Sequence, residues 1–339
     1  MEENMKKFYK MISCGLSLAI LFGLAACGGS DSGSTGEDAT EKQVEATTEA
    51  KEEEKSEFKV GETWTVDGLW SITVNSVTET DERNEYADQK PNAVYMVDYT
   101  YSNLGYEDST GMMDGLYIAF DDMIVDAEGT MGYEYPGNVT AYPQETPVGA
   151  NCKAQACIGV DNPGTFTVEV SLYDNDYNEY KAKFIMDPEA EAVETDASGS
   201  NVDNSSALKV GETWTVDGQW EFTITDVHKT DERNEYADTD PEAVYVLDYT
   251  YKNLGYEDET GLMDGLYISI EESVVDSEGT MGYSYPGDIE KYPEETPVGA
   301  TCNAQACIGV DHAGSFTVNV IQYDGNSQKQ TQSFLVEAE

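Results

Sequence analysis

Apolar and polar positions alternate along most of the chain with the period of two that is typical of β-strands. In residues 93–103, Val97 and Tyr99 fall on one face of the predicted strand, and polar residues fall on the other. The same pattern predicts further strands over residues 63–66, 70–77, 116–125, 152–160, 166–172 and 180–186. Since no stretch keeps a helical period, we predict an all-β protein.

The chain contains a long internal repeat. Val60 and the residues that follow it recur from Val210, and every aligned pair is separated by 150 positions without a gap. Roughly two thirds of aligned positions are identical, and a unit this long is a duplicated domain rather than a short solenoid repeat. We therefore predict two tandem β-sandwiches of about seven strands each. Repeat 1 covers residues 58–186 and repeat 2 covers residues 208–337.

Two polar segments flank repeat 1. Residues 27–57 and 187–207 are rich in Gly, Ser, Thr and acidic side chains, with almost nothing to bury. Such a composition favours a flexible chain over a packed domain. We predict both segments to be disordered acidic linkers.

The N-terminus has the features of an export signal. Lys6, Lys7 and Lys10 precede an apolar run over residues 11–26, which is too short to span a membrane comfortably. The run ends in Leu-Ala-Ala before Cys27, and this segment resembles the lipobox of bacterial lipoprotein signal peptides. The resemblance implies a signal peptide at residues 1–26, cleavage before Cys27 and a lipid on its sulfur. Two or more acyl chains such as palmitate hold a protein at the membrane for long periods, so we predict an extracytoplasmic, membrane-anchored lipoprotein.

Each repeat also resembles a known domain family. The motifs are a hairpin opened by Gly61-Glu62-Thr63, a long strand at residues 94–103 followed by Gly105, and Pro147-Val148-Gly149 before a late strand. They are similar to the telokin-like, immunoglobulin-fold domains of Gram-positive extracellular lipoproteins. The resemblance covers nearly all of both repeats. It implies an immunoglobulin-like sandwich in the cell envelope and says little about activity.

The charge of the chain restricts its partners. The sequence has 67 acidic and 18 basic residues, which gives a formal net charge of -49. This field repels phosphate backbones and anionic headgroups, so we predict no nucleic-acid partner. Cations and basic protein or peptide partners are compatible with it, and the charge also favours plain solubility.

Four cysteines lie inside the repeats, namely Cys152, Cys157, Cys302 and Cys307. An even number outside the cytoplasm favours disulfides, and pairing within each repeat needs no contact between domains. A straight strand would place the two α-carbons of each pair about 16 Å apart and on opposite faces, which prevents a bridge. Either the strand bends and the disulfide forms, or the thiols are free. We predict the disulfides. A zinc site or a redox-active dithiol has less support in this spacing.

An acidic segment with the sole arginine of each repeat falls between two predicted strands. Its candidate residues are Asp81, Arg83, Glu85 and Asp88, and in repeat 2 Asp231, Arg233, Glu235 and Asp238. We favour a clamp in which the arginine pairs with nearby carboxylates. Calcium binding and contact with a partner are the alternatives.

A loop rich in tyrosine and proline is the other candidate. Its tyrosines are Tyr133, Tyr135 and Tyr142, repeated as Tyr283, Tyr285 and Tyr292. Exposed, they would offer a large contact area to a partner. Folded inward, they would plug an open end of the sandwich, which we slightly favour.

The sequence gives little support to catalysis. The histidines His228 and His312 align with Thr78 and Asn162, so neither belongs to both repeats. Carboxylate pairs arise by chance in so acidic a chain. We predict no enzyme, no cofactor and no metal site, and expect a non-catalytic binding or adhesion protein. A calcium-binding envelope protein is the alternative, and a carboxylate-dependent hydrolase is a weaker one.

Overall fold

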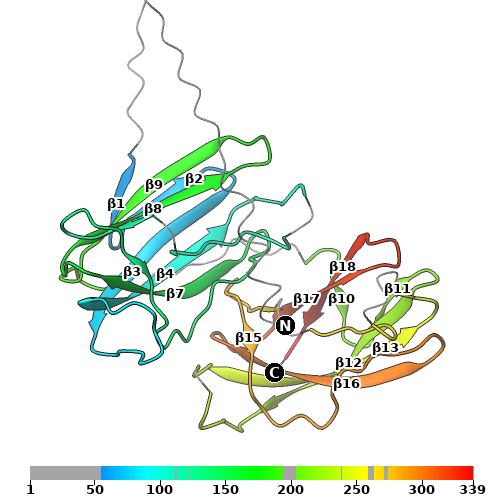
Figure 1. The fold of residues 1–339 in the computed structure, drawn as a ribbon. Coiled ribbons are helices and arrows are strands. Elements are labelled where there is room, and N and C mark those ends of the chain that lie inside the picture. The colour runs from blue at the N-terminus through cyan, green and yellow to red at the C-terminus, as the bar shows by residue number, and fades with distance from the viewer. Residues whose placement is uncertain are drawn as a thin grey trace, which may run out of the picture. The chain divides into compact units, whose positions relative to one another are not determined.

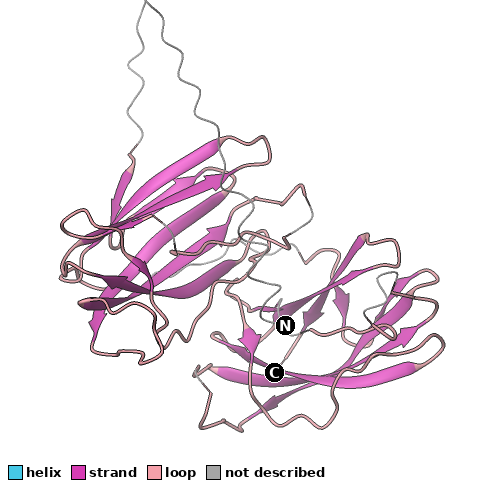
Figure 2. Ribbon diagram, viewed as in Figure 1, coloured by secondary structure: helices cyan, strands magenta, loops and turns pink. Residues whose placement is uncertain are grey.

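The computed structural model describes residues 55–110, 113–121, 123–193, 204–237, 239–258, 263–270 and 274–338. The predicted signal peptide, Cys27, nearly all of the first predicted linker and part of the second lie outside these residues. The regular elements of the described chain are β-strands joined by loops (Figure 2). None of the described residues forms a helix long and apolar enough to cross a membrane.

Repeat 1 folds into two sheets (Figure 1). The five-stranded sheet has the order β2-β3-β4-β7-β6, with strands Thr63–Val66, Trp70–Thr80, Ala93–Asn103, Asn151–Val160 and Tyr133–Glu134. The four-stranded sheet has the order β1-β9-β8-β5, with strands Glu57–Lys59, Glu179–Met186, Phe166–Tyr173 and Ile124–Val125.

Repeat 2 has the same strand order. Its five-stranded sheet runs β11-β12-β13-β16-β15, with strands Thr213–Val216, Trp220–Thr230, Ala243–Asn253, Thr301–Val310 and Tyr283–Ser284. Its four-stranded sheet runs β10-β18-β17-β14, with strands Leu208–Lys209, Lys329–Val336, Phe316–Tyr323 and Val274–Val275. The all-β prediction is confirmed, and each repeat is a sandwich-like half.

The core of each half lies between its two sheets and is aromatic. In repeat 1, Tyr99 of β4 stacks on Phe120 with ring centroids 4.3 Å apart, and Phe120 contacts Phe184 of β9 at 5.5 Å. In repeat 2, Phe222 of β12 and Phe334 of β18 meet at 5.3 Å. Because side chains alternate along a strand, the apolar positions on one face of each strand reach this interior.

The predicted hairpin at the start of each repeat is present, with a three-residue loop. Val66 pairs with Trp70 across the turn, and the N–H of Leu69 donates to the carbonyl of Val66 at 3.0 Å. Gly68 has φ +74°, a left-handed conformation that glycine adopts without steric cost. The Asp-Gly pair therefore ends one strand and reverses the chain so that the next strand pairs with it.

One predicted strand is largely wrong. Residues 116–125 alternate in polarity, yet pairing in a ladder is confined to β5 at the end of this range. Leu116 makes one isolated bridge to Thr146, and Leu116, Ile118 and Phe120 are buried. Among the described residues before β5, Leu116, Ile118 and Phe120 enter the core from a backbone that forms no strand, and this burial gives the same alternation.

The five-stranded sheet of each repeat has an outer face, which we define as the face opposite the core. On β13 it carries Val244, Val246 and Asp248, the positions that alternate with core residues. A β-bulge interrupts the pairing of β12 with β13 between Ile224 and Asp226, and an equivalent bulge lies in repeat 1 between Val74 and Ser76. Bulges re-aim the side chains that follow them. The candidate sites lie on this face.

Candidate functional site

The acidic loop that follows β3 and β12 is organised by its arginine. Nη1 of Arg83 donates to the carbonyls of Thr80 and Glu82, both at 2.7 Å. Arg233 makes the same pair of bonds, to Thr230 at 3.1 Å and Glu232 at 2.9 Å. The predicted clamp thus has carbonyl oxygens as acceptors, and the expectation of carboxylate partners is corrected for the described residues. Carbonyls at the strand end point their lone pairs into the turn, where the guanidinium fork fits.

The predicted carboxylates of this loop that the structure describes lie at the surface. Asp81, Glu85 and Asp88 are exposed, as are Asp231 and Glu235. Asp238 lies outside the described residues. Within the described chain, this loop does not bring three acidic, histidine or cysteine ligands together.

The tyrosine loop folds onto the acidic loop. Tyr135 is 3% exposed and Tyr285 is 4% exposed, so these two side chains follow the inward interpretation. The backbone N–H of Asn84 donates to the hydroxyl of Tyr135 at 2.7 Å, and Asn234 donates to Tyr285 at 2.8 Å. Both rings pack on the outer face of the sheet, in small clusters separate from the main core. They cover a sheet face rather than plug an end of the sandwich.

The other tyrosines divide between the two interpretations. Tyr142 and Tyr292 are 66% and 65% exposed, which suits contact with a partner. Tyr133 and Tyr283 are half-buried, and burial raises the pKa of both hydroxyls. The most exposed tyrosines of the acidic loop, Tyr86 at 85% and Tyr236 at 83%, were missed in the sequence because no tyrosine pattern marks them.

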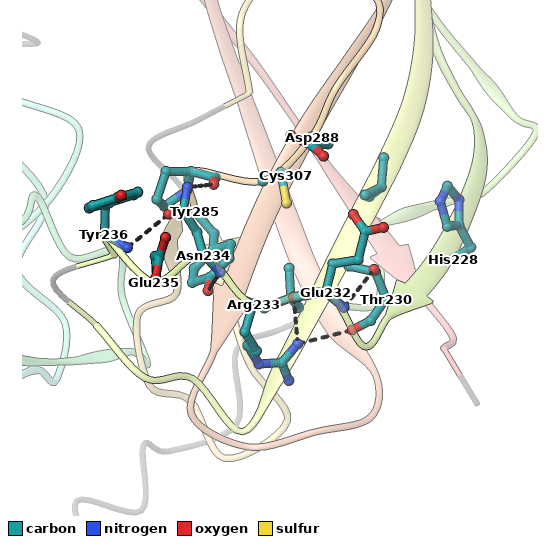
Figure 3. A pocket seen from close by; sticks show the side chains of 14 residues that line it. His228, Thr230, Glu232, Arg233, Asn234, Glu235, Tyr236, Tyr285, Asp288 and Cys307 are labelled. Atoms are coloured by element: carbon teal, nitrogen blue, oxygen red, sulfur yellow. Dashed lines mark hydrogen bonds between the residues drawn. The ribbon is translucent and has the colours of Figure 1, made fainter.

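A pocket of about 690 Å³ opens on the outer face of repeat 2. Val244, Val246 and Cys307 are buried and form its apolar floor. Its polar lining includes the carboxylates of Glu232, Glu235 and Asp288. Figure 3 shows His228 at one end of the pocket and Tyr236 at the other. The pocket therefore combines an apolar base with an acidic rim.

At the corresponding position of repeat 1, a hydrogen bond joins the two loops. Nδ2 of Asn138 donates to Oε1 of Glu82 at 2.9 Å. In repeat 2 the aligned residues are Asp288 and Glu232, both carboxylates, so the same bond cannot form without a proton. One substitution between otherwise similar repeats leaves two negative groups facing the pocket of repeat 2.

The predicted disulfides are corrected by the structure. Cys152, Cys157, Cys302 and Cys307 are free thiols. β7 is regular from Cys152, which pairs with Tyr101, to Cys157, which pairs with Met96. An odd separation along a straight strand places the two thiols on opposite faces, beyond the reach of a bridge.

The buried thiols are poor nucleophiles. Burial raises the pKa of Cys157 to about 11, and the nearby carboxylate of Glu82 adds to this effect. Burial also raises the pKa of Cys152 and of Cys307. A thiolate is the reactive form, so these side chains act as small apolar groups in the sheet.

A second loop is held by a buried carboxylate that the sequence did not single out. Oδ1 of Asp126 accepts from the N–H groups of Glu128 at 3.0 Å and Thr130 at 2.8 Å. Oδ2 accepts from the N–H of Asn162 at 3.0 Å and its Nδ2 at 2.7 Å. In repeat 2, Nδ1 of His312 lies 2.7 Å from Oδ2 of Asp276, so this histidine has a structural contact.

Comparisons with known proteins give this chain no family. No protein-family model matches it, and no curated protein matches it. A search of solved structures finds a likeness to the secreted serine protease VesC from Vibrio cholerae, with 16% identity and a TM-score of 0.19. The match covers 77% of this chain and 51% of that one, so this chain spans about half the length of the protease. A likeness this weak carries no argument about fold or activity.

Proposed function

We propose that this chain is a non-catalytic binding protein of the cell surface, whose second repeat holds a basic side chain of a peptide or protein partner. The observation that carries the proposal is the pocket of repeat 2, where carboxylates surround an apolar floor. A lysine or arginine side chain has the complementary form, because an aliphatic stem leads to a charged head. The stem fits over Val246 and Cys307, and the charge meets Glu232 and Asp288.

Exposed tyrosines support an interface around this pocket. Tyr236 stands at the rim with 83% of its surface exposed, and Tyr292 is 65% exposed. Tyrosine gives a large contact area with few rotatable bonds, so it is enriched in binding loops. The net charge of -49 would also draw a basic partner toward the chain before contact.

The test is the binding of a tetralysine peptide to the full chain at physiological ionic strength. Asp288→Asn gives repeat 2 the amide that repeat 1 has at this position, and we expect it to weaken binding about two- to fivefold, the range for one exposed charge pair. Asp217→Asn removes the same charge at the exposed turn before β12, far along that strand from the pocket. Equal weakening by both variants would show that general attraction to the acidic surface, not the pocket, holds the peptide.

A second variant separates contact area from charge. Tyr236→Ala leaves every carboxylate in place and removes an exposed ring, so we expect weaker peptide binding with an unchanged unfolding midpoint. A partner interface that excludes this loop predicts unchanged affinity instead. The measurement is the same titration, with thermal unfolding monitored in parallel.

We also propose that the chain is held at the membrane by lipid on Cys27 and that its halves are immunoglobulin-like, telokin-like sandwiches. The lipobox supports the first statement, and the two packed sheets of each half support the second. Labelled palmitate should enter the membrane-bound protein, and Cys27→Ser should abolish both labelling and membrane retention. Cys14→Ser is the matched control, because this cysteine precedes the cleavage point. Retention of the Cys27→Ser protein at the membrane would reject the anchor.

A further inference from the structure

Two carboxylates and a histidine meet on the outer face of repeat 2. Asp226 of β12 is the direct cross-strand partner of Asp248 of β13, and His228 lies two residues further along β12 on the same face. One potential ligand atom from each of the three side chains lies within 4.8 Å of the others. Asp226 and His228 are exposed, and Asp248 is half-buried, so an ion from solvent has access.

Repeat 1 keeps the aspartate at this position and lacks the other two groups. There, Ser76 Oγ donates to Oδ2 of Asp98 at 2.6 Å, and Gln155 Nε2 donates to Oδ1 at 2.8 Å. Both oxygens of the shared aspartate thus have a donor. Thr78 takes the place of His228. Repeat 2 has therefore exchanged a hydroxyl donor for a second carboxylate, and a threonine for an imidazole, within one small area.

The exchange leaves two carboxylates opposite each other, with the ammonium group of Lys291 as a counter-charge beside Asp248. Like charges directly opposite each other on neighbouring strands repel. In the described part of the chain, the donors to Asp248 are Gln305 Nε2 at 3.1 Å and Lys291 Nζ at 3.4 Å, and both reach Oδ1. Oδ2 loses the donor that Ser76 supplies in repeat 1 and becomes available to an ion.

We propose that Asp226, His228 and Asp248 bind a divalent transition-metal ion of the zinc class. Three protein ligands with a water in the fourth position form a common tetrahedral set, in which ligand atoms lie about 3.3 Å apart. The present separations, which reach up to 4.8 Å, must shorten to that value, and Asp226 and His228 are exposed side chains that can change rotamer. The imidazole favours zinc-class ions over calcium, which takes six to eight oxygens.

The bulge before Asp226 creates this arrangement. It adds one residue to β12 between Ile224 and Asp226, after which Asp226 faces Asp248 and His228 faces Val246. Two ligands thus come from alternate positions of one strand and the third from its neighbour. Ligands on paired strands are held more precisely than ligands on a loop.

The test is a Zn²⁺ titration of the full chain by calorimetry, in an excess of Ca²⁺ that saturates weak sites on the acidic surface. His228→Thr and Asp226→Ser install the residues of repeat 1, so both variants should fold. We expect each to weaken one zinc site at least tenfold. Co²⁺ in place of Zn²⁺ should give visible bands of a nitrogen and oxygen site, without the intense charge-transfer band of thiolate ligands. Identical titrations for the parent and both variants would overturn the proposal.

A graft into repeat 1 provides the reverse experiment. Ser76→Asp combined with Thr78→His should raise the number of tight zinc sites from one to two. No additional site in a folded graft would show that the three side chains are not sufficient. Asp288 lies outside the cluster, so Asp288→Asn should leave zinc binding unchanged. The zinc titration therefore tests the metal site independently of the proposed peptide pocket.

Discussion

The hydroxyl of Tyr285 accepts a hydrogen bond from the backbone N–H of Asn234 at 2.8 Å. Nδ2 of Asn234 in turn donates to the carbonyl of Pro286 at 2.6 Å. Two loops that are about fifty residues apart are thereby fastened to each other across the outer face of one sheet. Tyr135 and Asn84 repeat the first bond in repeat 1 at 2.7 Å, so the fastening belongs to the domain.

Removal of this hydroxyl should loosen the loops. We expect Tyr285→Phe to lower the free energy of unfolding by about 1 kcal/mol, the usual net value of one hydrogen bond. Tyr292→Phe is the control, because this ring is exposed and its change should stay within about 0.5 kcal/mol. Urea unfolding measures both. Equal stability of the two variants would mean that the Tyr285 bond contributes nothing in water.

The tyrosine loop approaches the sheet so closely that a glycine is needed. A β-carbon at Gly287 would overlap the sulfur of Cys307, and one at Gly137 would overlap Cys157. We expect Gly287→Ala to destabilise by about 1–3 kcal/mol through overpacking. In a Cys307→Ala background the sulfur is gone, and the cost should fall. The double-mutant cycle from thermal unfolding checks this, and an unchanged cost in that background would place the strain elsewhere.

The three buried thiols, Cys152, Cys157 and Cys307, should react slowly until the protein unfolds. Burial raises the pKa of Cys157 to about 11, so very little thiolate is present at pH 8. We expect slow alkylation by iodoacetamide at pH 8, faster alkylation as the pH approaches 11, and rapid alkylation in urea. Peptide mapping without reductant should find all four repeat cysteines modified after denaturation. Cysteines protected in urea until reductant is added would restore the disulfide prediction.

The stability of repeat 1 should depend on pH through Asp126. Burial alone would raise the pKa of this carboxyl, but hydrogen bonds from Thr130, Asn162 and Glu128 lower it overall. A lowered pKa means that the stabilisation is present above the unfolded value of about 3.9 and is lost as the pH falls through the folded value.

Asp126→Asn should therefore have a lower unfolding midpoint than the parent at pH 7. The difference between the two midpoints should become smaller as the pH falls. Asp81→Asn removes an exposed carboxylate and serves as the control. The measurement is the unfolding midpoint from pH 7 down to pH 3. A difference in midpoint that stays constant over this range would show that Asp126 does not contribute to the loss of stability in acid.

The strands with strict alternation could be predicted from the sequence because the buried face selects apolar residues and the other face selects polar ones. Residues 93–103 were predicted as a strand and form β4, and residues 166–172 form most of β8. The Asp-Gly turn has a separate signal in the sequence, because its left-handed conformation favours glycine. Periodicity failed at residues 116–125, where burial without a pairing strand gives the same alternation.

The candidate sites could be predicted only in part. Arg233, Tyr285 and Cys307 were singled out as residues, but their meeting on the outer face of repeat 2 depends on loop paths that no local pattern encodes. The metal cluster depends on a bulge and on the register that it sets between β12 and β13. Comparison of aligned positions between the repeats was the available signal, since His228 and Asp226 differ from Thr78 and Ser76.

The first strand of each repeat lies beside the last one and runs in the same direction. In repeat 1, β1 pairs in parallel with β9, from Glu57 opposite Lys183 to Lys59 opposite Ile185, and in repeat 2 β10 pairs in parallel with β18. A pull on the two ends of a repeat draws such neighbours past each other lengthwise. The force then acts on all their hydrogen bonds at once, in shear, so the bonds do not open one after another. We therefore expect each repeat to resist tension that is applied between its two ends.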